Sequence, residues 1–193
     1  NHSLNRITLP TTLRILRFGR DFNQSLKKVA LPISLHSLTF DREFNQKMAD
    51  VALPSNLRIL VFGYYFNQRM DKVILPSGLQ SLTFGDKFNQ NMDDVTLPSS
   101  LQTLTFGHDF NQNMDRVALS TELQSLTFGH DFNQSMERVT LPGSLVHLTF
   151  GEAFDQDMAR VILPMGLQQL SVSRRIASAG LEVSVGGNRL NYV

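Results

Sequence analysis

Residues 97–118 read LPSSLQTLTFGHDFNQNMDRVA, and this 22-residue unit recurs along the chain without an insertion or a deletion. A fixed period of this length is typical of a solenoid, in which each unit buries its apolar face only by stacking on its neighbours. The sequence therefore predicts one elongated repeat domain. Each unit opens on a leucine, and these are Leu9, Leu31, Leu53, Leu75, Leu97, Leu119, Leu141 and Leu163.

The repeat also sets the predicted domain boundaries. Residues 1–8 match the last eight positions of the unit, seven full units occupy residues 9–162, and a partial unit occupies residues 163–172. Because a solenoid end without a polar cap exposes core, the start in mid-unit leads us to expect a processed or truncated chain, or an end covered by a partner.

The pattern fails after Leu170, and residues 173–193 are predicted to form a carboxy-terminal cap over the last phenylalanine layer. Residues 181–185 and 189–193 flank Gly186-Gly187-Asn188, which predicts a pair of strands around a tight turn. An interaction tail is the alternative interpretation of this segment.

Composition narrows the function classes. The chain has 193 residues, 18 Lys or Arg against 17 Asp or Glu, and no cysteine. A net charge of +1 provides no overall field to attract nucleic acid. We see no apolar run of about 18 residues to span a membrane and no secretory signal. Without thiols there are no disulfides or thiolate metal sites, which favours an intracellular compartment. No cofactor is predicted.

The apolar positions predict how each unit folds. All 14 phenylalanines fall in two columns, so we expect them to stack in the core. Residues 102–106 alternate polar and apolar side chains, which predicts a strand with Leu104 and Phe106 inward and Thr103 and Thr105 outward. A second short strand is predicted at residues 139–141, ending before Pro142 because proline cannot donate a ladder hydrogen bond.

Two further columns carry turn residues. The glycine after the first phenylalanine of the unit suggests a turn with unusual backbone dihedrals. The column of asparagines beginning at Asn23, with a glutamine beside each, predicts a buried amide ladder that satisfies backbone groups in the turns. The methionine column, from Leu26 to Met158, is interpreted as core filler.

Residues 97–112, with their Leu-x-x-Leu-x-Phe pattern and Phe-Asn-Gln core, resemble the FNIP-type leucine-rich repeat of protist and giant-virus proteins. The likeness covers residues 1 to about 173. It implies a mainly β, right-handed leucine-rich-repeat solenoid with parallel β-sheet faces, short turns and few or no regular helices, used for protein–protein contact. It carries no catalytic residue to transfer, and the sequence shows no nucleophile with a base or phosphate loop, so an enzyme is not expected.

The variable columns suggest where a partner would bind. The outward strand positions are more apolar and basic near the amino terminus, and two tyrosines follow in the next turn. Tyr and Arg are enriched in interface hot spots, although drift between coils is an alternative explanation. The candidate partner-binding residues are Arg14, Ile15, Arg17, Arg58, Ile59, Val61, Tyr64 and Tyr65. Residues 1–80 hold eleven basic against five acidic residues and residues 81–193 hold seven against twelve, a gradient able to orient a partner.

Two other chemistries are compatible with particular columns. One turn column contains residues able to bind zinc or a similar ion, although a straight column spreads its ligands and an exposed charged turn explains them as well. The weak metal candidates are Asp86, His108, His130 and Glu152, with Asp109 and Asp131 adjacent. An outward threonine row suggests ice binding, although Thr is also a common exposed strand residue. The row contains Thr39, Thr83, Thr105, Thr127 and Thr149.

The sequence thus predicts a non-enzymatic solenoid for recognition or scaffolding of a protein partner. The main alternative is a structural subunit of a larger assembly, for which a membrane complex of a photosynthetic protist is one setting. Ice binding is the third hypothesis.

Overall fold

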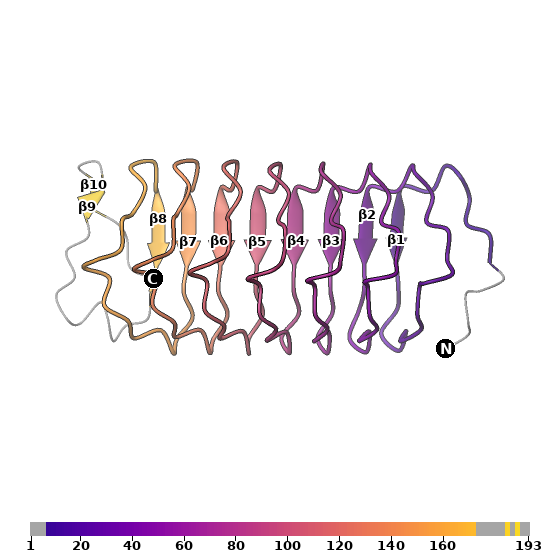
Figure 1. Ribbon diagram of the computed structural model, residues 1–193, viewed down its shortest axis with the longest axis horizontal. Coiled ribbons are helices and arrows are strands. Elements are labelled where there is room, and N and C mark those ends of the chain that lie inside the picture. Colours follow the sequence, from indigo (N-terminus) through magenta and orange to yellow (C-terminus); the bar gives the residue numbers. More distant parts are fainter. Residues whose placement is uncertain (1–6, 173–183, 186–187, 190–193) are drawn as a thin grey trace.

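The computed structural model describes residues 7–172, 184–185 and 188–189. Eight three-residue strands, one from each coil, form a single parallel sheet in chain order (Figure 1). They are β1 (Ile15–Arg17), β2 (Ser37–Thr39), β3 (Ile59–Val61), β4 (Ser81–Thr83), β5 (Thr103–Thr105), β6 (Ser125–Thr127), β7 (His147–Thr149) and β8 (Gln169–Ser171). No helix occurs in the described part of the chain. The predicted solenoid is confirmed.

The register of the sheet follows from the repeat. Because corresponding residues are one unit apart, each central leucine pairs with the central leucine of the next strand, as Leu82 pairs with Leu104. Leu104 is fully buried, whereas Thr103 and Thr105 on either side of it are only half-buried. The predicted alternation of inward and outward side chains is therefore confirmed.

The second strand predicted at residues 139–141 is wrong, because the described chain forms no strand there. The amide of Val139 donates instead to the carbonyl of Met136 at 3.1 Å, within the same coil. Pro142 follows and has no amide to donate. Each coil therefore contributes to one sheet, and the remainder of the coil is built from turns.

The phenylalanines form a continuous double stack behind the sheet. Within one coil, the rings of Phe106 and Phe110 are 3.8 Å apart between centroids and nearly parallel. Phe106 stacks on Phe128 of the next coil at 5.6 Å, and Phe110 stacks on Phe132 at 6.1 Å. Met114 beside them is also fully buried. The predicted aromatic core and its methionine filler are confirmed.

The glycine column has a different cause from the one predicted. None of the described glycines adopts left-handed backbone dihedrals. A Cβ on Gly107 would instead lie 2.2 Å from the carbonyl oxygen of Gly85 in the preceding coil. From Gly63 onward glycine is thus needed because successive turns approach one another closely, whereas a Cβ on Gly19 would meet nothing within 4 Å. Asp41 holds this position in the second coil, where its carboxylate accepts a hydrogen bond from the Arg42 amide at 2.7 Å.

The asparagine ladder forms as predicted but is half-buried and not fully buried. The side-chain oxygen of Asn89 accepts two hydrogen bonds from the next coil. The backbone amide of Asn111 donates one at 3.0 Å, and the side-chain amide of Gln112 donates the other at 2.8 Å. The same pair recurs from Asn23 to Asn133, so amides in irregular turns are satisfied without a second sheet.

Near the carboxy terminus, β9 (Ser184–Val185) pairs antiparallel with β10 (Asn188–Arg189). This agrees with the predicted strand pair around residues 186–188. The rest of the predicted cap lies outside the described residues. In the part of the chain that the structure describes, no helix is long and apolar enough to cross a membrane.

Candidate functional site

The outward side chains of β1 and β3 lie on one face of the sheet. The register aligns Ile15 with Ser37 and Ile59 in one row, and Arg17 with Thr39 and Val61 in the next. Ile15 is 56% exposed and Ile59 is 42% exposed, which is unusual for isoleucine in a core-forming strand. We call Ile15, Arg17, Ile59 and Val61 the amino-terminal strand face.

The two other arginines of the predicted patch differ from each other. Arg14 is exposed just before β1, so its charge remains available. Arg58 is half-buried, and its Nη1 donates to the backbone carbonyl of Ser55 at 3.2 Å. A Cβ on Gly78 in the next coil would lie 2.2 Å from that same nitrogen, so the guanidinium packs against the stack. The Arg58 guanidinium therefore packs between neighbouring coils and is less available to a partner than that of Arg14.

The turn after β3 carries an aromatic cluster. The rings of Tyr64 and Tyr65 meet edge to face with centroids 4.7 Å apart. The Arg42 guanidinium lies 5.3 Å from the centre of the Tyr64 ring, and Lys87 Nζ lies 5.7 Å from it. Such distances permit cation–π attraction. Arg42 and Lys87 are additions to the predicted site, and their sequence signal is that they occupy the tyrosine columns one unit away.

The same turn edge continues as a line of charged side chains toward the carboxy terminus. Lys87 Nζ lies 2.9 Å from an Asp109 carboxylate oxygen. This hydrogen bond is the main cause that lowers the pKa of Asp109 and raises the pKa of Lys87. Asp109 in turn lies 2.9 Å from His108 Nδ1.

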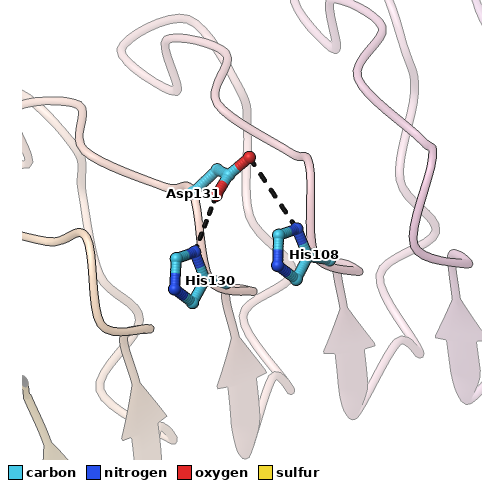
Figure 2. Close-up of side chains that lie close together, drawn as sticks. All are labelled: His108, His130 and Asp131. Carbon is cyan, nitrogen blue, oxygen red and sulfur yellow. Dashed lines mark hydrogen bonds and ion pairs between the residues drawn. The ribbon is translucent and has the colours of Figure 1, made fainter.

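Among the weak metal candidates, the structure brings two histidines together. The rings of His108 and His130 are parallel and stacked, with centroids 4.6 Å apart. Asp131, which the sequence placed only beside the column, points its carboxylate at both rings (Figure 2). Glu152 lies on the other side of His130, 3.7 Å from its Nε2. The described group of close ligand atoms does not include Asp86.

The surface depressions lie elsewhere. One of about 400 Å³ is lined by Lys47, Gln68, Arg69 and Asp71 among others. Another of about 440 Å³ is lined by Asp93, Asp115 and nearby arginines. Neither includes a residue of the amino-terminal strand face or of the aromatic cluster.

One protein-family model matches most of the chain. The family model described as FNIP Repeat matches residues 1–43, 44–87, 88–131 and 110–153. The chain belongs to the FNIP repeat family. Each match spans about two units, and together the matched FNIP repeats contain strands β1 to β7 of the sheet. No functionally curated protein shows significant similarity to the chain.

A solved structure extends the comparison to the fold. These FNIP repeats are similar to a chain described as "The crystal structure of CroV588 a novel circular LRR protein structure", with 37% sequence identity and a TM-score of 0.67. The match covers 96% of this chain and 28% of that chain, so this protein spans less than a third of its relative's length. The predicted leucine-rich-repeat fold is confirmed.

Proposed function

We propose that this FNIP-repeat solenoid is a non-enzymatic protein interaction module. Its partner binds the amino-terminal strand face and the neighbouring aromatic cluster of Tyr64 and Tyr65. The observation that carries the proposal is the alignment of exposed Ile15 and Ile59 in one row of the sheet, on either side of Ser37. Solenoid folds of this type are compatible with such a role.

The chemistry of this surface is that of an interface core. Ile59 and Val61 supply apolar area on β3, and the aromatic cluster begins three residues after Val61. Tyr and Arg contribute large contact areas together with hydrogen bonding, which is why they dominate hot spots. On β4 to β6 the outward positions are all Ser or Thr. Among β1 to β6, the apolar outward positions therefore occur on β1 and β3.

The test is affinity capture from native extract with mass spectrometry. We expect the triple variant Arg17→Glu, Ile59→Asp and Val61→Asp to lose the partners bound by wild-type protein, because it places carboxylates in the interface core. Loss of at least tenfold in captured partner is the expected size, since a desolvated hot spot is worth about 2 kcal/mol or more.

The matched control carries the same kind of change farther along the same face. Thr103→Glu, Thr105→Asp and Thr127→Asp place three acids on β5 and β6, and this variant is expected to retain the partners. Circular dichroism and the urea midpoint verify that both variants fold. Partners retained by the amino-terminal variant, or lost equally by the control, would contradict the proposed location.

Ice binding is a second candidate with a specific observation in its favour. Thr83, Thr105, Thr127 and Thr149 pair directly in register along β4 to β7. In the neighbouring row, however, His147 and Gln169 replace Ser or Thr on β7 and β8, and the threonines are half-buried. Ice binding predicts thermal hysteresis in the wild-type protein that Thr105→Lys abolishes. Nanolitre osmometry measures the thermal hysteresis. A wild-type protein that shows no hysteresis excludes this function.

A further inference from the structure

Three donor groups from two neighbouring coils meet on the turn edge beside β5 and β6 (Figure 2). His130 Nδ1 lies 2.7 Å from one oxygen of Asp131, and His108 Nδ1 lies 3.8 Å from the other. The three ligand atoms all lie within 4.8 Å of one another. A column of equivalent residues would spread its ligands, but Asp131 comes from the adjacent column and directs its carboxylate toward both rings.

These separations are close to those that a small metal ion requires. Zinc binds imidazole nitrogen at about 2.0–2.1 Å and carboxylate oxygen at about 2.0–2.2 Å, so ligand atoms in a tetrahedral set lie roughly 3.4 Å apart. The two nitrogen–oxygen distances, which run to different oxygens of the Asp131 carboxylate, fall on either side of that value. Because the three side chains are about half-exposed, small rotations can equalise the distances without disturbing the core.

The backbone that carries the ligands is fixed. The Asp131 amide donates to the His108 carbonyl of the preceding coil at 2.9 Å. The phenylalanine that follows in each turn, Phe110 or Phe132, is fully buried in the aromatic stack. The two imidazoles lie within 2° of parallel. A site held on rigid elements loses less conformational entropy when it binds its ligand.

We propose that His108, His130 and Asp131 bind one divalent transition-metal ion of the zinc class. Two imidazoles and a carboxylate suit Zn²⁺ and similar ions better than Ca²⁺ or Mg²⁺, which prefer oxygen ligands alone. Three protein ligands leave a further coordination position open to water or to a donor from another protein. The ion would join the coils that contain β5 and β6 at their turn edge.

The surrounding charges favour a cation. Asp109 lies 2.9 Å from His108 Nδ1, and Glu152 lies 3.7 Å from His130 Nε2. The ammonium of Lys87 on the same turn edge is already paired with Asp109 at 2.9 Å. Asp109 also competes for His108, so we expect an affinity in the micromolar range and not the tighter binding of a buried structural site.

Isothermal titration of the wild-type chain with ZnCl₂ at pH 7.5, in a buffer that does not bind metal, tests the proposal. We expect one saturable site per chain. His130→Gln and Asp131→Asn should each weaken binding at least tenfold, and His108→Gln should do the same. His147→Gln and His36→Gln remove histidines outside the cluster and should leave the affinity unchanged.

Because the ligands are half-exposed, circular dichroism and the urea midpoint in chelator should be unchanged in all five variants. This separates a lost ligand from a lost fold. Titration with Co²⁺ adds a visible absorption band that reports the coordination geometry. The absence of saturable binding in the wild type overturns the proposal. So does equal affinity after Asp131→Asn, or a loss caused by His147→Gln.

Discussion

Replacing Phe110 with alanine is expected to lower the free energy of unfolding by about 3–5 kcal/mol, the usual cost of truncating a fully buried phenylalanine. Phe110 is 0% exposed and lies inside the double stack, with a stacked phenylalanine in the coil on each side. Its ring contacts Phe106 at 3.8 Å, and it continues the stack to Phe88 at 6.0 Å and to Phe132 at 6.1 Å. The substitution removes contacts within one coil and with both neighbouring coils.

Urea unfolding followed by circular dichroism measures this change. In a solenoid each coil is stabilised mainly through its interfaces, so a defect in the middle also weakens the coupling between the two halves. We therefore expect a broader transition as well as a lower midpoint. A sharp, two-state transition with an unchanged slope would indicate that cooperativity does not pass through this column.

Phe22→Ala is the matched control. Phe22 occupies the same column but is only half-buried in the first coil, where its ring stacks on Phe18 and Phe44. Because less apolar area leaves water, the loss should be below that at Phe110 and no more than about 3 kcal/mol. Equal losses at the two positions would mean that the end layer contributes as much as the middle, against the expectation from burial.

The sequence predicted the sheet well because one physical rule governs every coil. Leu104 and Phe106 alternate with Thr103 and Thr105, and a strict repeat puts each residue in register with its equivalent. The register of a parallel sheet is usually a long-range property, but here the period determines it. Phe110 could be assigned to the core on the same basis, since only stacking explains aromatic residues confined to two columns.

The predictions that failed depended on backbone geometry that the repeat pattern does not encode. Val139 alternates with its neighbours like a strand residue, yet its amide forms a turn within the coil, and no periodicity distinguishes these outcomes. The sequence shows that glycine is required at Gly107. It does not show whether the reason is an unusual backbone conformation or the close approach of the preceding coil. Only the position of the Gly85 carbonyl decides.

The sequence could predict which residues of the candidate sites share a face, but not which side chains meet. Ile15 and Ile59 could be placed on one face from register alone. The joining of His108 and His130 by Asp131 could not be predicted, because it depends on side-chain rotamers and on the offset between adjacent columns. Arg42 occupies the same column as Tyr64 one unit earlier. Its contact with the tyrosine ring likewise depends on a side-chain rotamer, which the sequence does not specify.

Gly107→Ala and Gly19→Ala should change stability in opposite directions, although they occupy the same column. At Gly107 the new Cβ would lie 2.2 Å from the oxygen and 2.4 Å from the carbon of the Gly85 carbonyl. Both atoms belong to the backbone of the turn after β4, where the Gly85 carbonyl accepts a hydrogen bond from the Phe88 amide at 3.2 Å, so a side-chain rotation cannot relieve the clash. We expect a loss of about 1–3 kcal/mol, typical of overpacking in a rigid interior.

A Cβ added to Gly19 would meet nothing within 4 Å, and the backbone dihedrals there are ones that alanine adopts. Alanine restricts the unfolded chain more than glycine does, so this variant should be more stable by about 0.4–1 kcal/mol. Urea midpoints of the two variants, measured beside the wild type, test the predicted loss of stability in Gly107→Ala and the predicted gain in Gly19→Ala. A Gly107→Ala protein as stable as the wild type would show that the coils can separate locally at little cost. Equal destabilisation of both variants would indicate that the column requires the backbone conformation of glycine. That is the one cause that a crowded position such as Gly107 and an uncrowded one such as Gly19 can share.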